Sequence, residues 1–234
     1  MLKIRCSQLG KIMTKPRTKK ETLSKTTKNY LKELIIEKKF GIYKNIKSKY
    51  ITKGNMVEDD GINLCNEVLK LDFLYKNHEK FENDYLTGVP DVNTSETLLD
   101  IKSSWSAFTY FDVFFSDTIP NKDYYFQLMG YMMLTGKKQA ILSYCLLNTP
   151  DHLVEDEIRR EHWQLNAIDE IQEVREKIEK NHNFDRIDNQ LKVKTFVIDY
   201  DQEVVDDIKA QIEECRKYYS ELEKLLTIKE IQDA

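Results

Sequence analysis

Three carboxylates, one lysine and one glutamine follow one another in an order that suits the hydrolysis of a charged ester. Glu58 is the first residue of an otherwise apolar row along one face of an expected helix. Asp91 ends one expected strand, and Asp100 lies on the next strand. Lys102 shares the face of Asp100, and Gln127 occupies the following helix. Carboxylate oxygens are the ligands that Mg²⁺ prefers, and such an ion lowers the pKa of a bound water. An ammonium group beside it can orient that water, help to deprotonate it or stabilise the pentavalent phosphate. The pattern predicts metal-assisted phosphodiester hydrolysis.

The order of these residues is more specific than any one of them alone. The pattern acid-x-Lys occurs three times, at 37–39, 100–102 and 207–209, and Pro-Asp occurs twice. Of the three, only 100–102 lies on an apolar stretch that follows a Pro-Asp and precedes a helix with Gln127 and Tyr131 one turn apart. Each acid alone is typical of a surface ion pair or a turn cap. Their coincidence in this order favours a shared site.

The chain around these residues has the periodicities of alternating helices and strands. The expected helices are 29–39, 55–70, 121–135 and 201–226, and the expected strands are 84–92, 97–102, 139–147 and 194–200. A short helix is expected after an N-cap at Ser7, and another is expected to start at Thr149 and Pro150. This order predicts a layered α/β or α+β fold.

No linker in the sequence justifies a second domain, so we expect residues 1–234 to form a single domain. We divide it by composition and expected structure into four parts. These are a basic N-terminal part (1–54), a catalytic core (55–147), a helical segment (148–193) and a closing strand and helix (194–234).

Charge is distributed unevenly along the 234 residues, although the formal net charge is only −4. Residues 1–54 hold 16 Lys and Arg against 3 Asp and Glu, a balance of +13. Residues 55–234 hold 20 against 37, a balance of −17. A basic segment of this kind indicates a polyanionic partner. No apolar run approaches the ~20 residues that span a bilayer, and the first residues lack the apolar stretch of a signal peptide. We therefore expect a cytoplasmic protein with no membrane partner.

The cysteines and histidines indicate no zinc or redox centre. The spacings of 59, 80 and 70 residues between successive cysteines match no CxxC pattern. We expect free, buried thiols at Cys6, Cys65, Cys145 and Cys215. We expect surface positions for the histidines in polar surroundings, which are His78, His152 and His182.

Taken together, the motifs resemble those of the PD-(D/E)xK nuclease superfamily. They are most similar to the bacteriophage lambda exonuclease and YqaJ-type viral recombination nucleases. RCSQLGKIMTKPR resembles the segment that carries the family's phosphate-binding serine, here Ser7, and KGNMVEDDGINL resembles the helix with its metal-site acid, here Glu58. GVPDV, LLDIKSS and QLMGY supply the remaining matches, which are Asp91, Asp100 with Lys102, and Gln127 with Tyr131.

The resemblance implies a restriction-endonuclease-like core, in which a mixed central β-sheet is flanked by helices. It also implies 5′→3′ exonuclease action on linear double-stranded DNA, with one or two Mg²⁺ or Mn²⁺ ions. The metal ligands that it implies are Glu58, Asp91, Asp100 and the carbonyl of Ile101. Lys102 would serve the nucleophile, and Gln127 would support the site. A single-strand annealing protein is the implied partner, and ring-shaped trimers occur in the family.

The implied DNA contacts begin in the basic part of the chain. The candidate DNA-binding residues are Arg5, Ser7, Lys11, Trp105 and Tyr131. The lambda-type enzyme carries an arginine several residues before its serine, and Arg5 or Lys11 would take that place here. Trp105, which follows the motif strand, could stack on an unpaired base. The lysines that could neutralise the DNA backbone are those at positions 15, 19, 20, 25, 28, 32, 38, 39, 44, 47 and 49.

Two other functions fit the same residues. A structure-specific or restriction-type endonuclease of the same superfamily would use the same acids and lysine, but it would also cut closed circular DNA. A DNA-binding protein could keep the fold without turnover, although the intact acids and Lys102 argue against it.

Salt dependence tests the basic segment. If about six lysines contact phosphates, DNA affinity falls by roughly 10³-fold between 50 and 200 mM salt, because binding then releases condensed counterions. A fluorescence anisotropy titration of a duplex at several salt concentrations measures this slope. An affinity that is independent of salt would contradict a DNA-binding role for residues 1–54.

Overall fold

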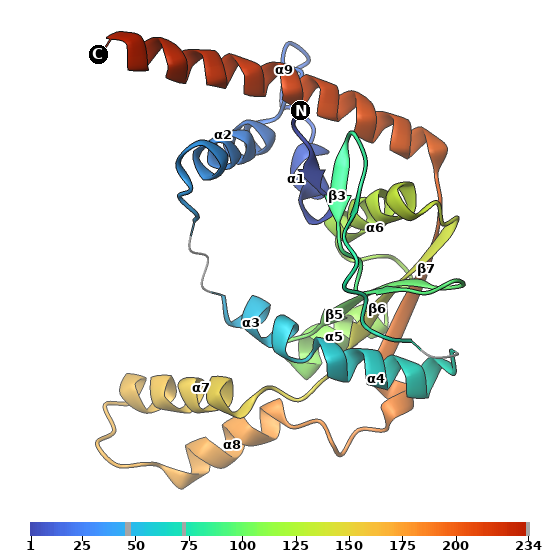
Figure 1. The fold of residues 1–234 in the computed structure, drawn as a ribbon. Helices are drawn as coiled ribbons and strands as arrows, with labels where there is room; N and C mark the ends of the chain where they lie inside the picture. The colour runs from blue at the N-terminus through green and yellow to red at the C-terminus, as the bar shows by residue number, and fades with distance from the viewer. Residues whose placement is uncertain (45–47, 72–73, 233–234) are drawn as a thin grey trace.

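The structure, a computed structural model, describes residues 1–44, 48–71 and 74–232, with side chains as far as 227 (Figure 1). Lys47, one of the lysines expected to contact DNA, lies outside the described residues. The helices are α1 (Leu9–Ile12), α2 (Lys25–Phe40), α3 (Lys49–Met56), α4 (Glu58–Leu69), α5 (Ala107–Phe114), α6 (Lys122–Thr135), α7 (Asp151–Gln164), α8 (Gln172–His182) and α9 (Gln202–Gln232), with short 3₁₀ helices η1 (Cys6–Gln8) and η2 (Asn189–Leu191). The strands are β1 (Ile4–Arg5), β2 (Phe81–Glu82), β3 (Leu86–Gly88), β4 (Val92–Asn93), β5 (Leu98–Ser103), β6 (Gln139–Cys145) and β7 (Val193–Asp199).

The described strands form two sheets. The larger has four strands in the order β4-β5-β6-β7, and the smaller has three in the order β1-β3-β2. In the larger sheet β5 and β6 run parallel, while β4 and β7 pair antiparallel at its edges. The prediction of a mixed sheet flanked by helices is therefore confirmed.

Two of the expected elements are divided in the structure. The strand expected at 84–92 is two strands in different sheets, because Pro90 has no N–H to continue the β3 ladder. The helix expected at 55–70 is the end of α3 followed by α4, and Val57 separates them with φ −101° and ψ 11°. Asp91 therefore lies where the chain passes from one sheet to the other, and Glu58 is the first residue of a helix.

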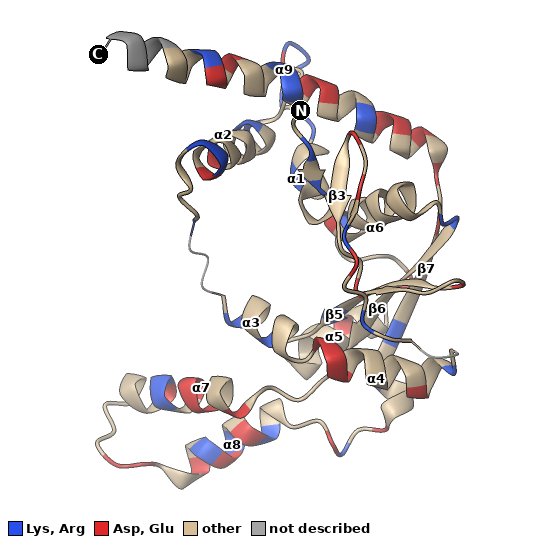
Figure 2. Cartoon of the chain, viewed as in Figure 1, with Lys and Arg blue, Asp and Glu red and all other residues tan. Residues whose placement is uncertain are grey.

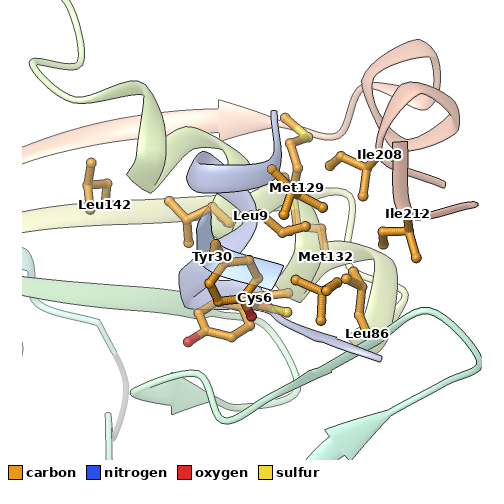
Figure 3. Packing of buried hydrophobic residues seen from close by; sticks show 14 of the residues in the cluster. Cys6, Leu9, Tyr30, Leu86, Met129, Met132, Leu142, Ile208 and Ile212 are labelled. Carbon is orange, nitrogen blue, oxygen red and sulfur yellow. The ribbon is translucent and has the colours of Figure 1, made fainter. Parts of the chain in front are cut away.

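The larger sheet is covered on both faces. On one face, α6, α9 and the N-terminal segment enclose the main hydrophobic core, which includes Leu9, Met129 and Ile212 (Figure 3). On the other face, Ile62 and Cys65 of α4 join a second cluster with strand residues such as Leu99 and Ile101. Because side chains alternate along β5, Asp100, which lies between these two, points to the first face, toward α6.

Helices α7 and α8 form a hairpin that lies at the opposite end of the molecule from α9 (Figure 1). Its own small core consists of Val154, Ile158 and Ile178, with Val174 packed against them. The described helices include none that is long and apolar enough to cross a membrane.

Two expectations about the hairpin were wrong. The N-cap of α7 is Pro150 rather than Thr149, and the Thr149 hydroxyl instead lies 2.9 Å from Nδ1 of His182. His182 is only 5% exposed rather than on the surface. Its sequence neighbours are polar, but the fold turns its ring inward against Thr149 and Trp105. The four cysteines are free and buried, as predicted.

Gly61 allows α4 to approach the sheet closely. A Cβ atom at this position would lie 2.9 Å from Cγ2 of Ile101 and 3.4 Å from Cδ1 of Leu147. Gly54, on α3, has open space around the corresponding position. The two glycines therefore form a matched pair for testing this contact.

We expect Gly61→Ala to destabilise the protein by about 1–3 kcal/mol, because the methyl group forces α4 away from β5. Gly54→Ala should instead stabilise it by about 0.5–1 kcal/mol, because alanine loses less backbone entropy in a helix. Urea denaturation measures both changes in the free energy of unfolding. Equal effects of the two substitutions would show that the α4–β5 approach is not tight.

Candidate active site

Asp100 and Lys102 project from β5 toward α6, as their alternation predicts. Asp100 is fully buried, and its Oδ1 accepts a hydrogen bond of 3.1 Å from Nε2 of Gln127. Its Oδ2 forms an ion pair of 2.5 Å with Nζ of Lys102. A buried carboxylate needs a compensating charge. Lys102 supplies that charge from the same face of the strand.

Asp91 lies beside this pair because two short contacts fix the loop that carries it. Its Oδ2 accepts a hydrogen bond of 2.7 Å from the backbone N–H of Ile101, in the strand between Asp100 and Lys102. Asn77 donates its backbone N–H to the Asp91 carbonyl at 2.8 Å. Desolvation and the negative charge of Asp100 raise the pKa of Asp91 to about 8, against the opposing effect of Lys102. The two carboxyl groups therefore repel each other when both are ionised.

Lys102 is held in its charged form. Burial lowers its pKa, but the negative charges of Asp100 and Asp91 raise it more, and the net shift is upward. The Nζ atom also lies 4.9 Å from the centre of the Tyr124 ring, at the start of α6. Of the roles considered for this lysine, the geometry favours a fixed positive charge over a base that removes a proton.

Gln127 belongs to a chain of hydrogen bonds that connects α6 to the strands. Its Nε2 also donates to the hydroxyl of Tyr131 at 3.0 Å, and that hydroxyl donates to the Val89 carbonyl at 3.1 Å. Tyr131 is only 4% exposed, so the expectation that it contacts DNA was wrong. The helical spacing of four residues puts it on the same buried face as Gln127. It positions Gln127, and through it Asp100.

Gly88 is a supporting residue that sequence reasoning missed. A Cβ atom there would lie 2.6 Å from Cε1 of Tyr131 and 3.0 Å from Sγ of Cys6. A glycine inside a strand often marks a close approach of this kind. Its presence within the expected strand 84–92 could therefore have predicted this contact.

Glu58 is the third acidic residue of the candidate site. It begins α4, is half-buried, and makes an ion pair of 3.3 Å with Lys76, which also pairs with Asp59 at 3.0 Å. Its negative charge adds to the upward shift of the Asp91 pKa, so it lies within electrostatic reach of the site. Figure 2 shows the start of α4 as an acidic turn. Lys76 has no motif around it, so no sequence pattern predicted this ion pair.

The expected DNA-binding residues are not gathered at one point. Ser7 is exposed and lies within η1 rather than at a helix N-cap, because the turn already begins at Cys6. Arg5 pairs with Glu37 at 3.5 Å, and Lys11 lies 5.4 Å from the centre of the Tyr30 ring.

The N-terminal segment nevertheless packs beside the site. Cys6 contacts the surfaces of Gly88 and Gly130, and Asp100 adds to the upward shift of its pKa, which is mainly due to burial. Ser7 follows Cys6 directly in the chain, and its side chain is exposed.

Trp105 packs against other side chains of the protein. Its ring meets those of Tyr50 and His182 edge to face, with centroids 5.5 and 5.0 Å apart. Nζ of Lys49 lies 4.3 Å from the ring centre. These contacts leave the ring half-buried.

The donor set fits a hard divalent cation. Among the described residues, no three His, Cys, Asp or Glu side chains are close enough together to hold one ion by themselves. Asp91 nevertheless accepts a hydrogen bond from the N–H of Ile101, the residue after Asp100, and the charge of Asp100 raises its pKa, so the two carboxyl groups lie close together. Mg²⁺ commonly takes one or two carboxylates and keeps several waters. The residues present are therefore compatible with such an ion.

A mixed sheet whose parallel strand carries Asp100 and Lys102, with Asp91 at the preceding strand connection, has the arrangement that the resemblance to PD-(D/E)xK nucleases predicts. Comparison with solved structures finds exonucleases with the same fold. A phage-related exonuclease from Haemophilus somnus 129PT is 28% identical and has a TM-score of 0.79, over 96% of both chains. The predicted resemblance to phage exonucleases of the lambda and YqaJ type is thereby confirmed.

A second solved structure shares the fold. An alkaline exonuclease from Laribacter hongkongensis is 15% identical and has a TM-score of 0.68, over 99% of this chain and 95% of that one. A further structure of that enzyme, at 14% identity, contains dAMP. The restriction-endonuclease-like core expected from the motifs is confirmed. No family model and no curated protein matches this chain.

Asp91→Asn tests the repulsion between the two carboxyl groups. The raised pKa means that folded Asp91 keeps a proton that the unfolded chain loses, from its ordinary value near 4 up to about 8. This carboxyl group therefore lowers the stability of the wild type as pH rises through that window, and asparagine does not. We expect the melting temperature of the variant, relative to wild type, to increase between about pH 5 and pH 9.

The melting temperatures are measured by circular dichroism in the presence of a chelator. Asp112→Asn, an exposed position on α5, is the matched control and should show a difference that does not change with pH. A constant difference for Asp91→Asn would contradict the proposed electrostatic repulsion.

Proposed function

We propose that this protein is a metal-dependent DNA exonuclease that degrades linear double-stranded DNA in the 5′→3′ direction. The observation that carries the proposal is the fully buried Asp100 carboxylate, which is paired with the Lys102 ammonium group and has the Asp91 carboxyl group beside it. The likeness to phage-related and alkaline exonucleases supports the same reaction class.

The chain's own residues divide the work of hydrolysis. Asp91 and Asp100, with the Ile101 carbonyl, would hold a Mg²⁺ or Mn²⁺ ion, and Glu58 would hold a second ion or orient the attacking water. When bound, such an ion supplies a water of lowered pKa and neutralises charge that develops on the phosphate. Lys102 remains protonated next to Asp100 and stabilises the same charge as a fixed cation.

Gln127 acts on Asp100 rather than on the DNA. Its amide donates one N–H to Asp100 and the other to the Tyr131 hydroxyl, which fixes its orientation. This holds the Asp100 carboxylate in one orientation without adding a charge. Rotation of Asp100 would weaken its ion pair with Lys102, so Gln127 helps to fix the orientation of this proposed metal ligand.

The DNA would approach across the basic N-terminal part. Residues 1–54 carry the excess of Lys and Arg, and many of these side chains are exposed on α2 and on the chain before it (Figure 2). Ser7, beside the site, would contact the terminal phosphate. We further propose that the enzyme acts in the cytoplasm, in phage-type recombination, together with a single-strand annealing protein. It would form a trimer like those of the family.

Lys102→Ala should lower kcat for digestion of linear duplex by about 10²–10³-fold, because the fixed cation beside the phosphate is lost. Duplex affinity, measured in Ca²⁺ without turnover, should change little. Lys217→Ala is the matched control: this lysine is exposed on α9, pairs only with Glu214 among the described side chains, and should leave kcat unchanged. Full activity of Lys102→Ala would overturn the assignment of the site.

The choice of substrate separates the remaining alternatives. An exonuclease digests a linear duplex and spares covalently closed circles, whereas an endonuclease of this superfamily nicks the circles. Duplexes with a 5′ phosphate, a 5′ hydroxyl or a blocked 3′ end then report the direction of digestion. A protein that binds all these substrates but cuts none with Mg²⁺ or Mn²⁺ would be a DNA-binding protein that keeps only the fold.

A further inference from the structure

Lys53 is a buried lysine that the site described above does not use. It lies on α3, and only 1% of its surface is exposed. Within the described part of the chain, it has no carboxylate partner, and its burial lowers its pKa to about 7. Burying an ammonium group is unfavourable unless its N–H donors find acceptors. The groups that Lys53 contacts must therefore compensate for its burial.

Both hydrogen bonds of Lys53 go to the chain that leaves the catalytic strand. Nζ donates to the carbonyl of Ser104 at 2.8 Å and to the carbonyl of Trp105 at 3.4 Å. The same atom lies 5.7 Å from the ring centre of Trp105 and 5.4 Å from that of Phe184. Aromatic faces attract a cation at such distances. The ammonium group thus contacts two consecutive peptide groups and lies near two aromatic rings.

These two peptide groups lie next to the site. Ser104 is two residues after Lys102, and its N–H continues the ladder between β5 and β6 with a bond of 3.1 Å to the Cys145 carbonyl. Lys53 is five residues before Glu58, and Val57 lies between them at the junction of α3 and α4. One side chain therefore joins the exit of β5 to the helix pair that carries Glu58.

The junction also includes the α7–α8 hairpin. Phe184 follows α8 and is 1% exposed, and the Trp105 ring contacts His182 at the end of α8. Lys49, one turn before Lys53, pairs with Glu157 of α7 at 2.8 Å. Lys53 is thus at the centre of the contact between α3, the exit of β5 and the hairpin.

We propose that Lys53 is a positioning residue for phosphodiester hydrolysis: by holding the Ser104 and Trp105 carbonyls against α3, it fixes Lys102 and Glu58 relative to each other. This inference rests on the proposed function of the site. A displacement of about 1 Å between reacting groups can lower the rate of an enzyme by about 10²-fold. Loss of the contact should therefore slow catalysis without weakening DNA binding.

Lys53→Met keeps the length of the side chain and removes its donors and charge. We expect kcat on linear duplex to fall at least about tenfold, while KM and the affinity for duplex in Ca²⁺ stay within about twofold. Hydrogen exchange of the peptide that covers 103–106, measured by mass spectrometry, should become faster. If this variant does not fold, Lys53→Gln, which keeps an N–H donor on a shorter chain, is measured in the same way.

Lys192→Met is the matched control for the loss of a buried lysine. Lys192 is 9% exposed, lies just before β7, and donates to Oδ1 of Asn189 at 3.1 Å. It should change the melting temperature but leave kcat and the exchange of 103–106 as they are. The comparison separates a local effect on β5 from general destabilisation.

The outcomes are distinct. Slow turnover with unchanged KM and faster exchange at 103–106 supports the inference. Unchanged exchange at 103–106, a kcat within twofold of wild type, or an equal loss of kcat in Lys192→Met overturns it. A wild-type protein that digests no linear duplex overturns the proposed function instead. The exchange measurement needs no activity, so it still decides whether Lys53 holds the exit of β5.

Discussion

The burial of one negative charge, the carboxylate of Asp100, is the constraint on which the surrounding structure depends. An ionised carboxyl group cannot be removed from water without a cation and hydrogen bonds to replace its hydration. Lys102 provides the cation from the same strand face, and Gln127 provides the hydrogen bond from α6. Tyr131 and the Val89 carbonyl then fix Gln127. These requirements explain why α6 packs on this face of β5 and why a polar residue interrupts its buried side.

The single positive charge of Lys102 does not balance all the negative charge at this position. This imbalance makes the position suitable for a bound cation. Asp91 adds a second carboxyl group next to the first, and its pKa is raised by burial and by the negative charge of Asp100, which Lys102 only partly offsets. A divalent cation would balance both carboxyl groups. Such a site lowers the stability of the metal-free fold, as is common where function and stability compete. Close packing carries this arrangement, since Gly61 and Gly88 bring α4 and Tyr131 within reach of the strand residues.

Sequence patterns predicted much of the site because its residues come from short local motifs. Alternation along β5 placed Asp100 and Lys102 on one face, and helical spacing placed Gln127 beside Tyr131. The strands at 139–147 and 194–200 were also correct to within a few residues, because continuous apolar runs leave little choice. The errors lay at boundaries, where Pro90 divided one expected strand between two sheets. They also lay in burial, where local polarity around His182 said nothing of its packing.

The sequence by itself determined the chemistry of the site: which acids, which lysine, their order and the face of the strand that they share. Tertiary structure decided the roles that depend on distant neighbours. It buried Tyr131 as a support, paired Glu58 with Lys76, and joined Lys53 to the exit of β5. The physical reason is the range of the interactions. Periodicity reports which way a side chain points from its own element, whereas burial, pKa shifts and long-range hydrogen bonds depend on what other elements bring against it.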